Sequence, residues 1–219
     1  MTLLSGEVIS MVNFIFDIDG TLIDTFDVYV PALKQVLQGH GYSPSDSELA
    51  SGFGISGDDA LKNLGIRDIR VRQTIFNEWA QASVQRIEHA TLYPGIEATL
   101  RQLKLNQQVK LVIATSKTKQ DYENGFQDRY AIGRLFDAYV TVDDTTEHKP
   151  NPAPIVAGLD KVNAQLNNSI YIGDTVHDLQ AAHAAGIKFA AALWGAMQPE
   201  QLVLADYHLN EPADLLKLV

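Results

Sequence analysis

Short apolar runs recur along this chain, and each ends at a polar residue or beside a glycine. Such runs are typical of strands that are buried on both faces of a parallel sheet. Amphipathic helical patterns separate them, as where Ile96, Leu100 and Leu103 follow helical spacing. This alternation predicts an α/β fold with a doubly wound, Rossmann-like parallel sheet. The predicted strands cover residues 12–16, 109–114, 138–142, 169–172 and 189–193.

Residues 26–91 interrupt the alternation, because their pattern predicts consecutive amphipathic helices without a strand of comparable strength. The 219 residues exceed a minimal domain but are few for two independent ones, so an inserted subdomain is expected. Tyr93-Pro94-Gly95 is typical of the turn that returns the chain to its core. We predict an α/β core from residues 1–25 and 93–219, and a helical subdomain from residues 26–92. Its predicted helices cover residues 27–38, 45–50, 56–64 and 69–89, with Ser56 and Asp59 as a capping box.

The chain is acidic, with 27 Asp and Glu against 17 Lys and Arg, a formal net charge of -10 and no cluster of basic residues. Nucleic-acid polymers and anionic membrane surfaces are therefore not expected partners. A small anionic substrate is still compatible if a divalent metal and one or two lysines reverse the local field. The absence of cysteine excludes thiol catalysis, disulfides and cysteine-rich zinc sites.

Residues 1–10 lack the basic segment of a secretion signal, and no run of 18 apolar residues follows them. We expect a cytoplasmic location by default. We also expect residues 1–10 to be poorly ordered and to have no role in the fold. The sequence does not predict the oligomeric state.

Two carboxylates follow the first predicted strand, in the segment from Asp17 to Thr21. Ligands of doubly wound sheets bind at this carboxyl edge. The Asp17 carboxylate can attack phosphorus without a base to activate it. Asp19 can protonate the leaving oxygen and later deprotonate a water molecule. The competing interpretation is an Asp-rich turn that only satisfies backbone amides.

A second pair of acids, Asp174 and Asp178, follows the fourth predicted strand and is spaced by about one helical turn. Together with Asp17, these oxygens are ligands of the kind that Mg²⁺ accepts. The competing interpretation is that both acids only complement the dipole of the following helix. The combination with Asp17 and Asp19 favours a metal site.

Three further residues are candidates for holding phosphate oxygens. Thr115 and Ser116 follow the second predicted strand and offer hydroxyl and backbone N–H groups, while Lys149 offers a positive charge. Taken singly, each has an ordinary alternative as a loop residue. The six histidines show no metal-ligand spacing, and we expect His148 and His177 to face solvent. We expect Phe53, Ile55 and Trp194 to serve packing more than substrate binding.

These four segments, in this order, resemble the haloacid-dehalogenase-like (HAD) hydrolase superfamily. Within it they are similar to the branch of phosphoglycolate phosphatases and β-phosphoglucomutases, which has a helical cap after the first motif. The resemblance spans nearly the whole chain. The matching motifs are DIDGTLIDT from Asp17, TSK from Thr115, KPNP from Lys149 and GDTVHD from Gly173 to Asp178.

The resemblance implies a role for each motif residue. It implies that Asp17 is the nucleophile and a metal ligand, and that Asp19 is the general acid/base, with its backbone carbonyl on the metal. It also implies that Thr115 and Lys149 hold the phosphoryl oxygens, with Lys149 also restraining Asp17. The remaining implied ligands of Mg²⁺ are Asp174, which binds directly, and Asp178, which completes or supports the site.

Comparison with the family narrows the predicted activity. Family dehalogenases typically lack an acid at the position of Asp19, so phosphate chemistry is favoured. Hexose-phosphate mutases have a histidine where this chain has Tyr29, and an arginine where it has Gly57. Ser116 stands where asparagine is common, which leaves the hydrogen bonding of that loop open.

The predicted function is that of a Mg²⁺-dependent phosphatase acting on a small phosphorylated metabolite through an aspartyl-phosphate on Asp17. Phosphoglycolate, a sugar phosphate, a nucleotide and pyrophosphate are the candidate substrates. The alternatives are a phosphosugar mutase, or a metabolite-binding regulator that keeps the fold without turnover.

Overall fold

The computed structural model describes residues 11–219, so the expected disorder of residues 1–10 lies outside the described residues. Six parallel strands form the central sheet in the order β5-β4-β1-β6-β7-β8. This arrangement confirms the predicted α/β fold. The strands of the sheet are β1 (Val12–Phe16), β4 (Val109–Ala114), β5 (Ala138–Val140), β6 (Ser169–Gly173), β7 (Lys188–Ala192) and β8 (Tyr207–Leu209).

Helices cover both faces of this sheet. Alternate residues of β1 point to opposite faces, so Phe14 and Phe16 join one apolar cluster while Ile15 joins the other. The first cluster includes residues of α5, and the second includes residues of α7 and α8. The α-helices are α5 (Ile96–Leu103), α6 (Lys119–Tyr122), α7 (Ala153–Lys161) and α8 (Val176–Ala184). A π-helical segment, η2 (Glu123–Gln127), follows α6, and the 3-10 helices are η3 (Ala131–Leu135), η4 (Val142–Asp144), η5 (Leu166–Asn168), η6 (Pro199–Leu202) and η7 (Pro212–Leu218).

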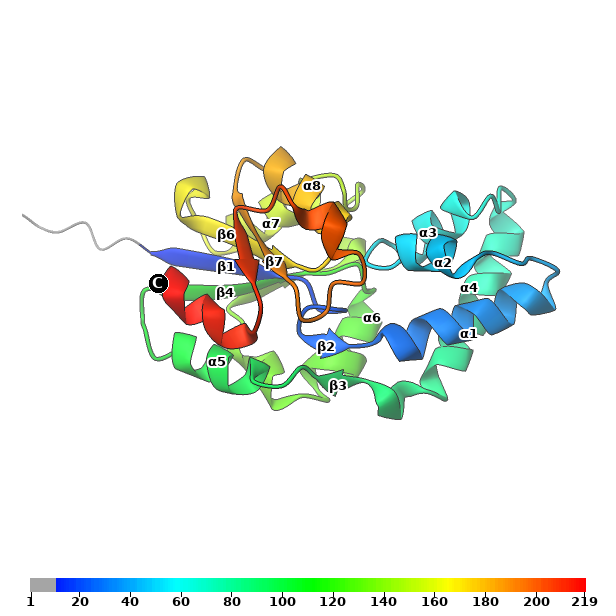
Figure 1. Ribbon diagram of the computed structural model, residues 1–219, viewed down its shortest axis with the longest axis horizontal. Coiled ribbons are helices and arrows are strands. Elements are labelled where there is room, and N and C mark those ends of the chain that lie inside the picture. Colours follow the sequence, from blue (N-terminus) through cyan, green and yellow to red (C-terminus); the bar gives the residue numbers. More distant parts are fainter. Residues whose placement is uncertain (1–10) are drawn as a thin grey trace, which may run out of the picture.

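Four helices follow one another between β2 (Ile23–Asp24) and β3 (Thr91–Leu92), which pair as a small antiparallel sheet. They lie together at one end of the molecule, beyond the carboxyl ends of the main strands (Figure 1). They also share a separate apolar cluster, which includes Leu37, Leu61 and Ile75. We call residues 26–92 the helical insertion. Its helices are α1 (Phe26–Gly39), α2 (Asp46–Ser51), α3 (Gly57–Asn63) and α4 (Ile69–Val84), followed by the turn η1 (Ile87–His89).

The helix boundaries of the insertion differ from the predicted ones only at the ends. α4 stops at Val84 rather than at residue 89, where a separate 3-10 turn follows. The predicted capping box at α3 forms only in part: the hydroxyl of Ser56 accepts a hydrogen bond from the N–H of Asp59, but the Asp59 carboxylate accepts the Ser56 hydroxyl rather than its backbone N–H. A full capping box forms at the start of α2, between Ser45 and Glu48.

Two strands of the main sheet depart from the prediction by more than one residue. β5 ends at Val140 rather than at residue 142, because Thr141 caps a 3-10 turn through Asp144. β8 was not predicted, since it has only three residues and follows no extended apolar run. It adds to the sheet by pairing with β7.

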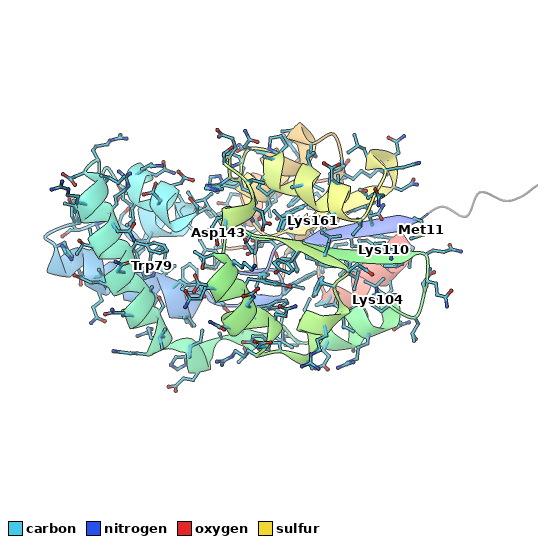
Figure 2. All side chains as sticks on the ribbon, turned by 180° about the vertical axis from the view of Figure 1, so that it is seen from behind. Met11, Trp79, Lys104, Lys110, Asp143 and Lys161 are labelled. Atoms are coloured by element: carbon cyan, nitrogen blue, oxygen red, sulfur yellow. The ribbon has the colours of Figure 1, made fainter. Side chains whose placement is uncertain are left out.

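Asp137 ties the start of β5 to β4. Its Oδ2 accepts the N–H of Leu111 at 2.9 Å, and its carboxylate forms ion pairs with Lys104 and Lys110 at 2.9 and 3.4 Å. Both lysines lie at the end of the molecule away from the insertion (Figure 2). Partial burial alone would raise the pKa of Asp137, but the hydrogen bond and the two lysines hold it below its usual value.

Among residues 11–219 no helix has the length and apolar character needed to cross a membrane.

Candidate active site

The predicted site residues leave the sheet at neighbouring positions. Phe16 of β1 lies opposite Ile113 of β4 and Ile172 of β6, so the residues that follow these three strands share one edge. The N–H of Asp17 donates to the carbonyl of Ile172 at 3.0 Å, which fixes the first acid beside β6. The structure therefore brings together the segments after β1, β4 and β6.

Lys149 lies beneath this edge with its ammonium between two acids. Its Nζ is 3.0 Å from Asp17 Oδ1 and 2.8 Å from Asp178 Oδ1. It also donates to the hydroxyl of Tyr171 at 3.3 Å, and that hydroxyl donates to the carbonyl of Ala114 at 2.9 Å. All of the charged groups here are buried, with Lys149 only 3% exposed, so they must satisfy one another.

Asp174 is held in this cluster by two residues of the first motif. Its Oδ1 accepts the hydroxyl of Thr21 at 2.8 Å, and Gly20 packs directly against its carboxylate. A Cβ at Gly20 would lie 2.1 Å from Asp174 Oδ2, so only glycine allows this approach. Thr21 was not among the predicted site residues, although it belongs to the first motif.

The three buried acids repel one another. Burial raises the pKa of Asp17 to about 7 against the opposing attraction of Lys149, and Asp178 and Asp19 raise it further. Burial also raises the pKa of Asp174, with Asp178 and Asp17 adding to the effect. One ammonium therefore does not neutralise this cluster.

A divalent cation fits this arrangement. Oxygens of Asp17, Asp174 and Asp178 lie within 4.8 Å of one another. Asp174 Oδ2 is buried and accepts no hydrogen bond from the described residues. Asp17 Oδ1 likewise lacks a hydrogen bond of good geometry within residues 11–219, although Lys149 Nζ is close. Unpartnered carboxylate oxygens in a buried acidic cluster are suited to a hard cation such as Mg²⁺.

Asp178 differs from the other two acids, because both of its oxygens already have partners. Oδ1 accepts from Lys149 at 2.8 Å, and Oδ2 accepts the hydroxyl of Thr175 at 2.7 Å and its N–H at 3.1 Å. Together with Thr175 it forms a capping box at the start of α8. Asp178 therefore stabilises the start of α8, as the competing interpretation predicted, and it also belongs to the site through its contact with Lys149.

Asp19 lies apart from this cluster and points toward the helical insertion. Its Oδ1 accepts the hydroxyl of Thr25 at 2.8 Å and forms an ion pair with Lys117 Nζ at 2.8 Å. Lys117 also donates to the hydroxyl of Tyr29 at 2.9 Å. Burial alone would lower the pKa of Lys117, but Asp19 and Tyr29 raise it above its usual value. Lys117 belongs to the TSK motif, but the motif alone indicates no role for it.

Thr115 and Ser116 follow β4 as predicted, but their side chains have different surroundings. Thr115 is buried, and its hydroxyl accepts the N–H of Lys117 at 3.3 Å. The hydroxyl of Ser116 donates to the carbonyl of Gly54, in the α2–α3 loop of the insertion, at 2.9 Å. Any contact of Ser116 with phosphate would therefore come from its backbone N–H.

Both motif-flanking histidines reach the insertion instead of simply facing solvent. The Nε2 of His177 lies 3.2 Å from the carbonyl of Ser51, and the Nδ1 of His148 lies 3.5 Å from Asp59 Oδ2. The expectation that they face solvent is therefore incomplete.

A cavity of about 220 Å³ lies beside the contact of His177 with Ser51, between α2 of the insertion and the start of α8. Its lining includes Asp174, His177, Phe53 and three side-chain amides (Asn63, Gln198, Gln201).

Two of the three residues expected to pack do so, and the third has a mixed role. The indole N–H of Trp194 donates to the carbonyl of Thr21 at 2.9 Å, which braces the first motif. Ile55 is buried. Phe53 packs its ring against Phe26 at 5.7 Å between centroids and also lines the cavity.

Comparison with known proteins identifies the class to which this fold and site belong. The sequence profile described as haloacid dehalogenase-like hydrolase matches residues 14–192. The chain belongs to this hydrolase family, which confirms the resemblance predicted from the four motifs.

Individual relatives cover nearly the whole chain. A phosphoglycolate phosphatase of Aquifex aeolicus is 29% identical over 209 residues, which is 94% of this chain and 95% of that protein. The pyrophosphatase PpaX of Bacillus cereus is 28% identical over 212 residues, 94% of each chain. Among solved structures, a hydrolase from Pseudomonas syringae has a TM-score of 0.85 and 26% identity, covering 94% of this chain and 96% of that one.

Proposed function

We propose that this chain is a Mg²⁺-dependent phosphatase that transfers the phosphoryl group of a small metabolite to Asp17. The observation that carries the proposal is the burial of Asp17 at the end of the central strand, with Lys149 Nζ 3.0 Å from it and Asp174 in the same cluster. This carboxylate is held by Lys149 and leaves the sheet at the edge where the segments after β4 and β6 also end. That is the placement expected of a nucleophile.

The proposed reaction has two steps. In the first, a carboxylate oxygen of Asp17 bonds to phosphorus, the bond from phosphorus to the leaving oxygen breaks, and Asp19 gives that oxygen a proton. In the second, a water molecule attacks the same phosphorus and gives a proton to Asp19. The bond to Asp17 then breaks, inorganic phosphate leaves, and both aspartates return to their starting states.

Lys149 and Thr115 have supporting roles in this proposal. Lys149 holds Asp17 in place and opposes the negative charge that develops on the phosphoryl oxygens, and Thr115 offers its hydroxyl and backbone to them. Mg²⁺, held by Asp17, Asp174 and the Asp19 backbone carbonyl, would supply positive charge that screens the phosphate from the acids. Asp178 would support the site through its contact with Lys149.

We further propose that the helical insertion acts as a cap domain, with residues 1–25 and 93–219 as the core. The contacts of Ser116 with Gly54 and of His177 with Ser51 support this proposal, because they join insertion backbone to the segments that follow β4 and β6. A cap in this position would limit access of water during phosphoryl transfer.

The substrate is proposed at the level of a small phosphate ester or anhydride. The relatives named as a phosphoglycolate phosphatase and a pyrophosphatase support phosphoglycolate and pyrophosphate as the first compounds to examine. A sugar phosphate and a nucleotide complete the test set. Release of phosphate from pyrophosphate alone would place the activity among anhydride hydrolases rather than phosphoric monoester hydrolases.

The test is hydrolysis of p-nitrophenyl phosphate and acetyl phosphate by the purified protein, with Mg²⁺ and with EDTA. We expect turnover only with the metal, and we expect Asp17→Asn to abolish it. Asp160→Asn, an exposed acid on α7, is the matched control and should keep full activity. Undiminished turnover by Asp17→Asn would refute the proposed mechanism.

A further inference from the structure

Lys117 is a buried lysine that the proposed reaction does not use. It lies between β4 and α6, is 9% exposed, and reaches toward the helical insertion. Its ammonium lies 2.8 Å from Asp19 Oδ1 and 2.9 Å from the hydroxyl of Tyr29. It also lies 4.7 Å from the centroid of the Tyr29 ring. A buried ammonium needs partners of this kind, and both of these lie far from Lys117 in the sequence.

The carboxylate of Asp19 is bound through one of its two oxygens, Oδ1. Within residues 11–219, both the hydroxyl of Thr25 and the ammonium of Lys117 bind Oδ1. These two contacts fix the plane of the carboxylate and leave Oδ2 as the oxygen free to exchange a proton. The Asp19 side chain keeps 15% of its surface exposed, so it is not sealed from solvent as Asp17 is.

Tyr29 is itself fixed by the insertion. It lies in the first turns of α1, and its backbone carbonyl accepts the indole N–H of Trp79 at 2.9 Å. Trp79 is on α4, and its ring meets that of Tyr29 edge-on at 6.4 Å between centroids. Figure 2 shows Trp79 within the helical insertion, away from the sheet. The position of Lys117 therefore depends on two helices of the insertion.

We propose that Lys117 is a positioning residue for Asp19, held in place by Tyr29, so that Asp19 Oδ2 meets the leaving oxygen of the substrate. This inference rests on the proposed function, since it assigns Asp19 the role of general acid. It adds two residues, Lys117 and Tyr29, whose effect on the reaction passes entirely through Asp19.

This role makes a specific prediction about leaving groups. An alkoxide is a poor leaving group and needs a proton as the bond to phosphorus breaks, whereas a nitrophenolate leaves readily without one. Loss of Lys117 should therefore slow hydrolysis of an alkyl phosphate much more than hydrolysis of p-nitrophenyl phosphate. A residue that only stabilised the fold would affect both substrates equally.

The experiment compares kcat/KM for ethyl phosphate and p-nitrophenyl phosphate, because this constant covers the steps through departure of the leaving group. For Lys117→Met we expect a fall of about 10- to 100-fold with ethyl phosphate and of less than about 3-fold with p-nitrophenyl phosphate. Tyr29→Phe removes only the hydroxyl and keeps the ring. It should show the same selectivity with a smaller loss of about 3- to 10-fold. This second variant tests the inference even if Lys117→Met does not fold.

Two controls separate positioning from general damage. Lys119→Met removes an exposed lysine two residues away and should leave both rate constants unchanged. In an Asp19→Asn background, Lys117→Met should cause no further loss with ethyl phosphate, since its effect passes through Asp19. Urea denaturation establishes that each variant is folded under the assay conditions.

The outcomes distinguish the inference from the function beneath it. Equal losses on both esters, no loss on either, or an additive loss in the Asp19→Asn background would overturn the role of Lys117 while leaving the phosphatase intact. If the unmodified protein hydrolyses neither ester but remains folded, the proposed function fails and the inference falls with it.

Discussion

Gly20→Ala tests whether the first motif places Asp174 as the structure indicates. Gly20 has a φ of +80°, and a Cβ there would lie 2.1 Å from Asp174 Oδ2. An ordinary contact begins at 3.4 Å, so the carboxylate must retreat by roughly 1 Å. The positive φ costs an alanine about 1–2 kcal/mol, and the displaced carboxylate adds about 1–3 kcal/mol.

Gly186→Ala is the matched control for this change. Gly186 has a φ of +75°, and nothing lies within 4 Å of the position that a Cβ would take. It should lose only the backbone contribution of about 1–2 kcal/mol. The difference between the two variants therefore isolates the contact with Asp174.

Urea denaturation in EDTA measures the stability of both variants, and a thermal-shift titration with Mg²⁺ measures metal binding. Gly20→Ala should unfold more easily than Gly186→Ala and bind Mg²⁺ more weakly. Its kcat/KM should fall about 100-fold, because a displacement near 1 Å at a reacting centre has an effect of this size. Equal stability of the two variants, together with unchanged Mg²⁺ affinity and turnover in Gly20→Ala, would refute the reasoning.

Two further predictions concern charged groups. Lys149→Met leaves the buried carboxylates of Asp17 and Asp178 without their ammonium, so we expect a loss of about 3–5 kcal/mol by urea denaturation at neutral pH in EDTA. A loss below about 1 kcal/mol would contradict the buried ion pairs. In the folded chain the pKa of Asp137 lies below its ordinary value of 3.8. The ionised carboxylate therefore stabilises the fold fully above pH 3.8, and this stabilisation is lost as the pH falls through the lower pKa of the folded state. Asp137→Asn should therefore lower the free energy of unfolding at pH 7 by at most about 1 kcal/mol, since solvent screens the ion pairs with the two lysines. The same variant should lose less stability than the unmodified protein as the pH falls through the acid range. Asp160→Asn should change neither the free energy of unfolding nor its dependence on pH.

The apolar runs were sufficient to predict most of the sheet. β1, β4 and β6 are buried on both faces, so their sequences have no polar alternation and stand out clearly. β8 lies at the edge of the sheet and has only one buried residue among three, so it carries no comparable signal. Short edge strands depend on their neighbour more than on their own sequence.

The meeting of Asp17, Thr115 and Asp174 could also be predicted, because the carboxyl ends of parallel strands share one edge. The surroundings of Lys117 could not. Its contact with Tyr29 joins residues 88 positions apart and requires α1 to pack against the β4–α6 loop. The same holds for His177, whose contact with the insertion depends on the placement of α2. The catalytic and metal-binding roles of these residues stay predictions until the variants are measured.

The distribution of charge explains how an acidic chain can hold a phosphate ester. The candidate site has four carboxylates, of which Lys149 contacts two and Lys117 contacts one. The fourth belongs to Asp174, whose Oδ2 is buried without a hydrogen-bond partner among the described residues. When all four carboxylates are ionised, the two ammonium groups leave a formal charge of -2, which one divalent cation beside Asp174 would cancel. Under the proposed function, Asp19 enters the first step protonated, so a dianionic phosphate would then approach a site that is not net negative, whatever the charge of the rest of the surface.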